Sequence, residues 1–229
     1  MNFKDMNWMQ VEDYLKRDDR VMVVLGACEQ HAYLSLQTDT QIPQAISNAA
    51  SERTGVIIAP PLAMGVSPYF LDFPGSISLR TDTFMAVVED IVTSLYHQGF
   101  RRFAFVNGHG GNGCVKYRLI ELANQLPEMR AVWHQWWTSD VLRVWASEHD
   151  LAPYHASWME NFHFTRVGAS IPEGKKEPVQ LNLLDSAIAN RAKLGDGSFG
   201  GDYQISDELM QEILNLCVND LVELLNFNS

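Results

Sequence analysis

The sequence of 229 residues has few cysteines, little positive charge and no long apolar run. Its three cysteines are widely spaced and form no C-x-x-C pair, so a disulfide framework is disfavoured and a reducing compartment is expected. Only 17 Lys and Arg stand against 28 Asp and Glu, which gives a formal net charge of −11. This balance argues against a nucleic-acid partner, because a phosphate-binding surface needs concentrated Lys and Arg.

No stretch approaches the roughly 18 apolar residues of a membrane helix, and residues 1–20 lack the continuous apolar core of a signal peptide. We therefore expect a cytoplasmic protein without a membrane partner. Apolar residues make up 46% of the chain and charged residues 20%, an ordinary globular composition that excludes disordered and fibrous classes. With no internal repeat and no linker, the chain is predicted to form a single domain over residues 1–229.

Short runs rich in β-branched residues alternate with helical patterns along the chain. The sequence predicts strands at residues 21–25, 56–59, 102–106 and 129–134, and helices at residues 8–16, 41–53, 83–98, 112–125 and 141–148. Residues 65–80 are predicted to form a long loop, residues 168–201 to be irregular with a short helix at 183–191, and Ser206 to cap a last helix. Continuous apolar strands separated by helices indicate a parallel sheet covered on both faces, an α/β fold.

Functional side chains in such sheets collect at the carboxyl ends of the strands, and this chain has unusual residues there. Carboxylates and imidazoles follow the first and third predicted strands and a later Pro-containing turn: Glu29, His31, Asp39, His109, His155 and Glu160. Oxygen and nitrogen ligands of this kind suit Zn, Mn or Fe, and a carboxylate can bridge two ions. The pattern is therefore typical of a hydrolytic metal site.

Other interpretations of these residues stay open. Asp39 could simply cap the next helix, and an acid such as Glu160 is common in a first helical turn. Residues 108–113 satisfy G-x-G-x-x-G, but they follow the third strand and Glu128 precedes the next strand instead of ending it, which disfavours a dinucleotide site. A nucleophilic Cys28 is a further alternative, although alternation along an extended backbone indicates that its side chain faces the core.

Several segments, taken in order, resemble the creatininase (creatinine amidohydrolase) family. They are Glu-Gln-His at 29–31, Thr-Asp-Thr at 38–40, Pro-Pro-Leu at 60–62, Phe-Pro-Gly-Ser-Ile-Ser-Leu at 73–79, Asn-Gly-His-Gly-Gly-Asn at 107–112, His155 with Glu160, and Gly-Gly-Asp at 200–202. The resemblance implies a three-layer α/β/α fold with a mainly parallel central sheet. It also implies two divalent metal ions per subunit (Zn, Mn or Fe) and a homo-oligomer, commonly a hexamer.

The resemblance further implies a ligand set in which Asp39 bridges the two ions. Glu29 and His109 would complete one metal position, and His31 and Glu160 the other. The chain departs from the family pattern at Gly111, where creatininase itself has a metal-binding glutamate, and in residues 29–36, which lack a second histidine. Ser157 and Trp158 also differ from the usual residues. These departures argue against creatinine as the substrate.

The resulting prediction is a metal-dependent amidohydrolase that uses a metal-activated water to cleave a non-peptide C–N bond, in a cyclic amide or a formamide. His155 or Glu160 would move the proton as catalytic residues, with His155 preferred. The residues predicted to shape a pocket for a small-molecule amide are Tyr33, Asn107, Gly110, Asn112 and Trp158, with Tyr69 and Phe70 as further walls. For the aromatic residues among them, a place in the core or in a subunit interface is the alternative.

Three further functions remain as alternatives. One is a formylamino-pyrimidine deformylase-like enzyme, since that branch of the family also carries Gly-His-Gly-Gly-Asn, here residues 108–112. Another is an enzyme that cleaves a modified peptide terminus. The third is a non-catalytic oligomeric metal-binding protein, which the intact ligand set disfavours because structural metal sites tend to be closed.

Overall fold

The computed structural model describes residues 1–182 and 184–228. Within these residues the central sheet has the strand order β2-β1-β3-β4, and every pairing in it is parallel. The strands are β1 (Arg20–Leu25), β2 (Ile57–Ile58), β3 (Arg102–Asn107) and β4 (Arg130–Gln135). Because β1 and β3 are neighbours along their whole length, the segments that follow them leave the sheet side by side.

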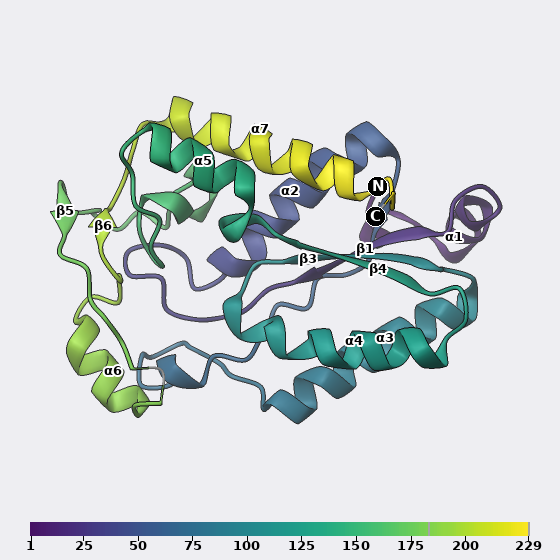
Figure 1. The fold of residues 1–229 in the computed structure, drawn as a ribbon, viewed down its shortest axis with the longest axis horizontal. Helices are drawn as coiled ribbons and strands as arrows, with labels where there is room; N and C mark the ends of the chain where they lie inside the picture. Colours follow the sequence, from purple (N-terminus) through teal and green to yellow (C-terminus); the bar gives the residue numbers. More distant parts are fainter. Residues whose placement is uncertain (183, 229) are drawn as a thin grey trace.

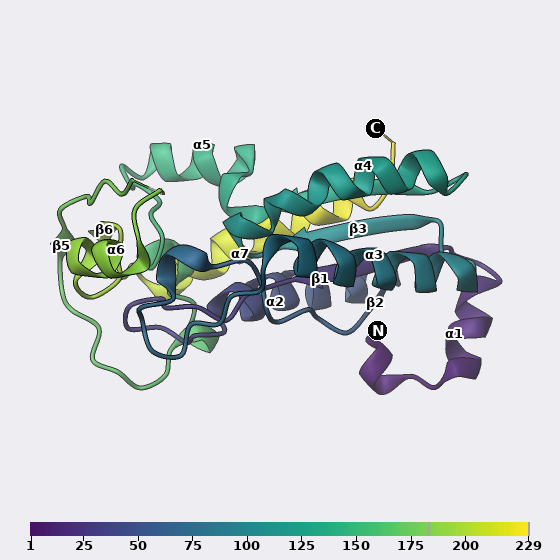
Figure 2. The ribbon, with the colours of Figure 1, turned by 90° about the horizontal axis from the view of Figure 1, so that it is seen from below.

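Helices cover both faces of this sheet, as Figures 1 and 2 show. One face carries α2 (Thr38–Thr54), α5 (Asp140–Glu148) and α7 (Asp207–Leu224). The other face carries α3 (Thr81–Gln98) and α4 (Val115–Gln125). The predicted three-layer α/β/α fold with a mainly parallel central sheet is confirmed.

The strands show why the sheet needs two covering layers. Met22 and Val24 of β1 pack into the core on the α2 and α7 side, whereas Val21, Val23 and Leu25 pack on the α3 side. All five side chains are at most 1% exposed. Burial of each such side chain stabilises the fold by about 1.5–3 kcal/mol. A strand buried on both faces therefore appears in the sequence as a continuous apolar run.

Most predicted elements are present with shifted ends. Helix α1 (Trp8–Leu15) begins after Asn7, whose side chain accepts a hydrogen bond from the Gln10 N–H at 3.1 Å, and Ser206 caps α7 through the Leu209 N–H. The helix predicted at 41–53 begins earlier, at Thr38, so Asp39 lies in its first turn. The helix predicted at 112–125 begins later, at Val115, because a 3-10 turn, η3 (Gly110–Cys114), precedes it.

The two long connecting segments are mainly irregular, as expected. A 3-10 turn, η2 (Pro68–Phe70), interrupts the loop predicted at residues 65–80. The later segment holds β5 (Lys175–Lys176), α6 (Ala187–Leu194) and β6 (Gly201–Asp202). The short helix predicted there starts at Leu183, which lies outside the described residues; α6 starts after Ser186, whose side chain caps it at the Ala189 N–H.

These elements place the unusual polar residues at one end of the molecule. Figure 1 shows α6, β5 and β6 beyond the carboxyl ends of β1 and β3, at the opposite end of the sheet from α1. Within the described residues, no helix combines the length and the apolar character that crossing a bilayer requires.

Candidate metal centre

Two glycines allow the start of α2 to approach the ends of β1 and β3. A Cβ atom on Gly26 would lie 2.2 Å from the Thr40 hydroxyl oxygen, and one on Gly108 would lie 1.9 Å from the Asp39 carbonyl oxygen. Any side chain at either position would therefore push α2 away from the sheet. This close approach carries the Asp39 carboxylate between the two strand ends.

Asp39 is the centre of a buried cluster of carboxylates and imidazoles. Its Oδ1 lies 2.9 Å from His31 Nε2, and its Oδ2 lies 3.0 Å from His109 Nδ1. Glu29 Oε1 lies 3.3 Å from the same His109 nitrogen, and Glu160 Oε2 lies 3.8 Å from His31 Nε2. The five residues predicted as metal ligands thus form two groups of three that share Asp39.

Backbone carbonyl groups orient both histidines toward the cluster. His31 Nδ1–H donates to the Glu29 carbonyl oxygen at 3.1 Å, which leaves Nε2 free to face Asp39. His109 Nε2–H donates to the Val66 carbonyl oxygen at 2.9 Å, which leaves Nδ1 free. A hydrogen bond of this kind to the far nitrogen is what fixes the tautomer of metal-binding histidines.

The cluster favours positive charge at its histidines. Burial alone would lower the pKa of His31, but the carboxylates of Asp39 and Glu160 outweigh it and raise the pKa to about 10. Burial likewise acts against the charged form of His109, yet Glu29 and Asp39 raise its pKa well above the usual value. Burial raises the pKa of Glu160 to about 7. An environment that holds protons on buried imidazoles also favours other cations.

The donor set fits two divalent ions. Each oxygen of Asp39 faces a different histidine, as a bridging carboxylate requires. Glu29 Oε2 is buried and has no hydrogen-bond partner among the described residues, an arrangement that is costly unless a cation satisfies it. Mixed nitrogen and oxygen donors suit Zn, Mn or Fe. The residues present therefore fit the dinuclear site that the resemblance implies.

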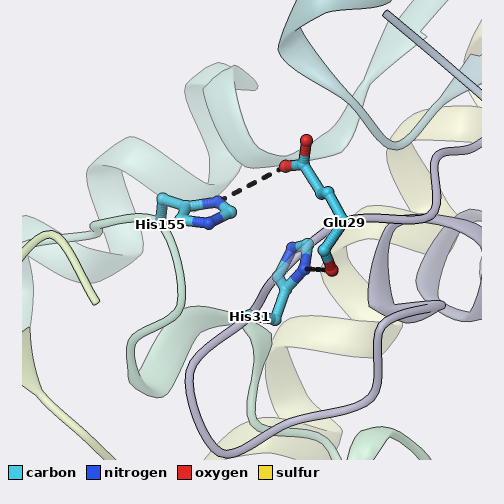
Figure 3. A group of neighbouring side chains, drawn as sticks. All are labelled: Glu29, His31 and His155. Carbon is cyan, nitrogen blue, oxygen red and sulfur yellow. Dashed lines mark hydrogen bonds and ion pairs between the residues drawn. The ribbon is translucent and has the colours of Figure 1, made fainter. Parts of the chain in front are cut away.

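His155 lies beside the cluster without joining its hydrogen bonds to Asp39. Figure 3 shows its ring facing the Glu29 carboxylate, with Nδ1 3.9 Å from Oε1. The ring stacks on Phe70 at a centroid distance of 5.0 Å and contacts His31 at 4.5 Å. Burial, together with repulsion from His31, lowers the pKa of His155 to about 3. Its imidazole is therefore neutral at physiological pH.

A cavity of about 450 Å³ opens onto this cluster. Its lining includes the acids and histidines Glu29, Asp39, His109, His155 and Glu160, and the aromatic residues Tyr69, Phe70, Trp137, Tyr154 and Phe199. Polar groups at the base and aromatic walls are typical of a small-molecule site. The predicted walls Tyr69 and Phe70 do line the cavity.

Among the five residues predicted to bind substrate, Gly110 lines the cavity, and the other four lie elsewhere. The Asn107 side chain donates to the His109 carbonyl oxygen at 2.7 Å, and that of Asn112 donates to the Gly26 carbonyl oxygen at 3.0 Å. Trp158 is fully buried in the core, where its indole N–H donates to the Ala152 carbonyl oxygen. Tyr33 packs edge-on against Tyr203. In the structure, the side chains of Asn107 and Asn112 hold backbone carbonyl groups instead of facing the cavity. Trp158 occupies the core position that was the alternative for the aromatic residues.

Sequence reasoning missed Trp137, Tyr154 and Phe199 as cavity walls. Trp137 follows the carboxyl end of β4, so the strand-end rule could have found it, and Tyr154 immediately precedes His155. Phe199 lies in an irregular segment with no sequence signal; it reaches the site because its backbone N–H donates to the His155 carbonyl oxygen at 3.0 Å.

The structure also bears on the two alternative sites, a dinucleotide site at residues 108–113 and a nucleophilic Cys28. His109, inside the G-x-G-x-x-G segment, points at Asp39 and Glu29, whose charges would repel a pyrophosphate. Cys28 is half-buried, and its thiol donates to the Gly75 carbonyl oxygen at 3.4 Å instead of facing the cavity. The expectation that Cys28 faces the core is wrong: β1 ends at Leu25, so strand alternation does not extend to this residue.

Comparison with known proteins establishes the family. The family model described as Creatininase: Creatinine amidohydrolase matches residues 4–225, so the chain belongs to the creatininase family. It is 36% identical over 99 residues to the mycofactocin precursor peptide peptidase of Mycolicibacterium smegmatis, a match that covers 40% of each chain. It is 20% identical over 159 residues to the 3-dehydro-scyllo-inosose hydrolase of Thermotoga maritima, which covers 69% of this chain and 51% of that one.

The chain thus matches about two fifths of the peptidase and half of the hydrolase by length. A solved structure of creatinine amidohydrolase (creatininase) superposes with a TM-score of 0.82 at 22% identity, over 97% of this chain and 95% of that one. A structure named Creatininase Mn superposes equally well, and a variant of the same enzyme is described as Zn-Zn type. At this level of identity the superpositions establish a common fold.

Proposed function

We propose that the protein is a metal-dependent amidohydrolase that cleaves a non-peptide C–N bond of a small-molecule amide, either a cyclic amide or a formamide. The observation that carries the proposal is the shared Asp39 carboxylate, with one oxygen toward His31 and the other toward His109, at the base of an aromatic cavity. Hydrolase function is common to this chain's family, and the structures named with Mn and Zn-Zn support two divalent ions as its cofactors.

The roles of the side chains follow from their positions. Glu29, Asp39 and His109 would hold one ion, and His31, Asp39 and Glu160 the other. Bound there, divalent ions supply a water of lowered pKa and polarise an amide carbonyl. Tyr69, Phe70 and Trp137 provide apolar walls for the hydrocarbon part of the substrate. Glu160 and His155 are the side chains placed to hold a proton or a hydrogen bond near the reacting amide.

Metal analysis combined with a substrate panel tests this function. The panel contains creatinine, a simple lactam, a hydantoin, a formylamino-pyrimidine and short peptides with free termini. We expect the metal-loaded protein to hydrolyse the lactam, the hydantoin or the formamide, with activity lost on chelation and restored by Zn or Mn. Bound metal without hydrolysis of any member would instead support the non-catalytic binding protein.

A peptide bond is the second candidate for the cleaved C–N bond. The 36% identity to a peptide peptidase over 99 residues favours it, and a second cavity beside α5 shares the lining residues Arg143 and Pro153 with the first. Cleavage of the free peptides alone, with no lactam, hydantoin or formamide hydrolysed, would replace the first candidate with this one.

A further inference from the structure

We propose that Gln30 is a positioning residue that fixes the ring of His155 in the tautomer whose Nδ1–H faces the metal cluster, so that His155 serves the reaction as a hydrogen-bond donor. Gln30 lies between two predicted ligands, Glu29 and His31, but its side chain points away from Asp39 toward two later segments of the chain. The donor role of His155 rests on the proposed function, whereas the assignment of its tautomer does not.

Two backbone groups fix which way the Gln30 amide points. Its Oε1 accepts a hydrogen bond from the Ala32 N–H at 3.1 Å, and its Nε2 donates to the Gly197 carbonyl oxygen at 3.1 Å. Exchanging the oxygen and the nitrogen would set two oxygens against each other at Gly197 and two N–H groups against each other at Ala32. The nitrogen of the amide therefore faces Gly197.

The second hydrogen of that amide nitrogen is directed at His155. Gln30 Nε2 lies 2.9 Å from His155 Nε2, so the ring nitrogen accepts and carries no hydrogen of its own. The Gln30 carbonyl oxygen lies 3.1 Å from the same ring nitrogen and favours the opposite tautomer. In that tautomer, however, a ring N–H would oppose the amide N–H across the shorter of the two contacts. The proton of the neutral ring is thereby assigned to Nδ1.

The surroundings hold this arrangement rigid. Gln30 is 5% exposed, and a Cβ atom on Gly197 would lie 1.9 Å from its Oε1, so only glycine admits the amide there. Lys176 holds the segment that contains Gly197 in place, because its ammonium donates to carbonyl oxygens on both sides of that glycine, those of Leu194 and Ser198, at 2.6 and 2.7 Å. The stacked Phe70 ring prevents His155 from turning over.

This tautomer decides what His155 can contribute. Nδ1–H points across the cavity toward Glu29 Oε1, at 3.9 Å, and can donate to an oxygen of the substrate that gains negative charge. It presents no lone pair to the cavity, so it does not accept a proton from water. An imidazole that polarises a carbonyl through its N–H in this way is a known catalytic arrangement. Movement of the proton is then left to Glu160.

NMR of the zinc-loaded full chain, labelled with ¹⁵N at histidine, tests the tautomer without any substrate. We expect the His155 ring, identified by its loss in His155→Gln, to show a protonated Nδ1. In Gln30→Met, which adds no charge, Nε2 faces the Gln30 carbonyl alone, so the proton should move to Nε2. Ser76→Ala is the matched control, because the Ser76 hydroxyl accepts from the Gln30 backbone N–H at 3.0 Å without touching the amide; it should leave Nδ1 protonated.

A protonated Nε2 in the wild type, or no change of tautomer in Gln30→Met, would overturn the proposal. The kinetic arm uses the panel member that the wild type hydrolyses fastest. With zinc content unchanged, Gln30→Met should lower kcat about 100-fold, as removal of an oxyanion donor does, and should leave KM within about threefold. Unchanged kcat would refute the donor role. If the wild type hydrolyses no panel member, the proposed function fails, while the NMR result still decides the tautomer.

Discussion

At the scale of single residues, small side chains matter as much as ligands. Gly111 stands where creatininase has a metal-binding glutamate, and the structure gives the position a different use. A Cβ atom there would lie 1.9 Å from the Val66 carbonyl oxygen and 2.7 Å from His109 Nε2. The missing side chain is therefore what lets Val66 hold His109 in its metal-facing tautomer.

Gly111→Ala should weaken metal binding for this reason. We expect a 10- to 100-fold loss of zinc affinity, about the effect of removing an outer-shell partner of a ligand, measured by competition with a chelator. Gly110→Ala is the matched control, since nothing lies within 4 Å of a Cβ atom at that position. Equal affinities for the two variants would show that Val66 does not orient His109.

The sequence was informative about residues whose chemistry sets them apart. Glu29 and His109 were candidates because they follow two strands of an apolar sheet, whereas the role of Asp39 came from the family resemblance. Trp158 and Asn112 could not be placed, because whether a tryptophan lines a cavity or fills a core depends on packing between distant segments. Tertiary contacts of that kind leave no local pattern.

At the scale of elements, the segment between α6 and β6 closes the site although it has little regular structure. Burial alone would raise the pKa of Asp196, but hydrogen bonds from Lys176 and Tyr203 outweigh it and lower the pKa. These contacts hold the stretch that carries Gly197 and Phe199. The boundaries of this segment could not be predicted, because hydrogen bonds between side chains and carbonyl groups hold it in place and no periodic pattern of apolar residues marks it.

Asp196→Asn should therefore destabilise the protein in a pH-dependent way. Because the pKa of Asp196 is lower in the folded state, its stabilising contribution is present above the unfolded pKa of about 4 and is lost as the pH falls through the lower pKa of the folded state. We expect about 1 kcal/mol less stability at pH 7 from urea unfolding, and a difference from the wild type that shrinks as the pH is lowered below about 4. A difference that is constant over this pH range would contradict the assigned charge interaction.

At the scale of the whole molecule, the acidic surface is separate from the chemistry. Three acids, Glu29, Asp39 and Glu160, form the candidate site, out of 28 in the chain. The parallel character of the sheet and its two covering layers could be predicted because strands buried on both faces have a distinctive composition. The oligomeric state could not be predicted from these patterns, because it depends on side chains at the surface.

We propose a homo-oligomer, on the strength of the family resemblance, and the surface supports it. Trp8 and Met9 of α1 are 70% and 50% exposed, and Tyr117 and Ile120 of α4 are 77% and 60% exposed. Contiguous exposed apolar surface is typical of association sites, and these residues are neighbours on their helices. Light scattering after gel filtration should give a mass that is a multiple of 25.9 kDa. A mass of one chain at micromolar concentration would contradict the proposal.

The central claim is that one buried carboxylate joins two metal positions, and metal content tests it most directly. Elemental analysis after loading with zinc should give two ions per chain in the wild type and in Asp82→Asn, a matched change of an exposed aspartate in the first turn of a helix. Asp39→Asn should lose both ions, since both groups of ligands depend on Asp39. Two ions retained by Asp39→Asn, or none bound by the wild type, would contradict the account.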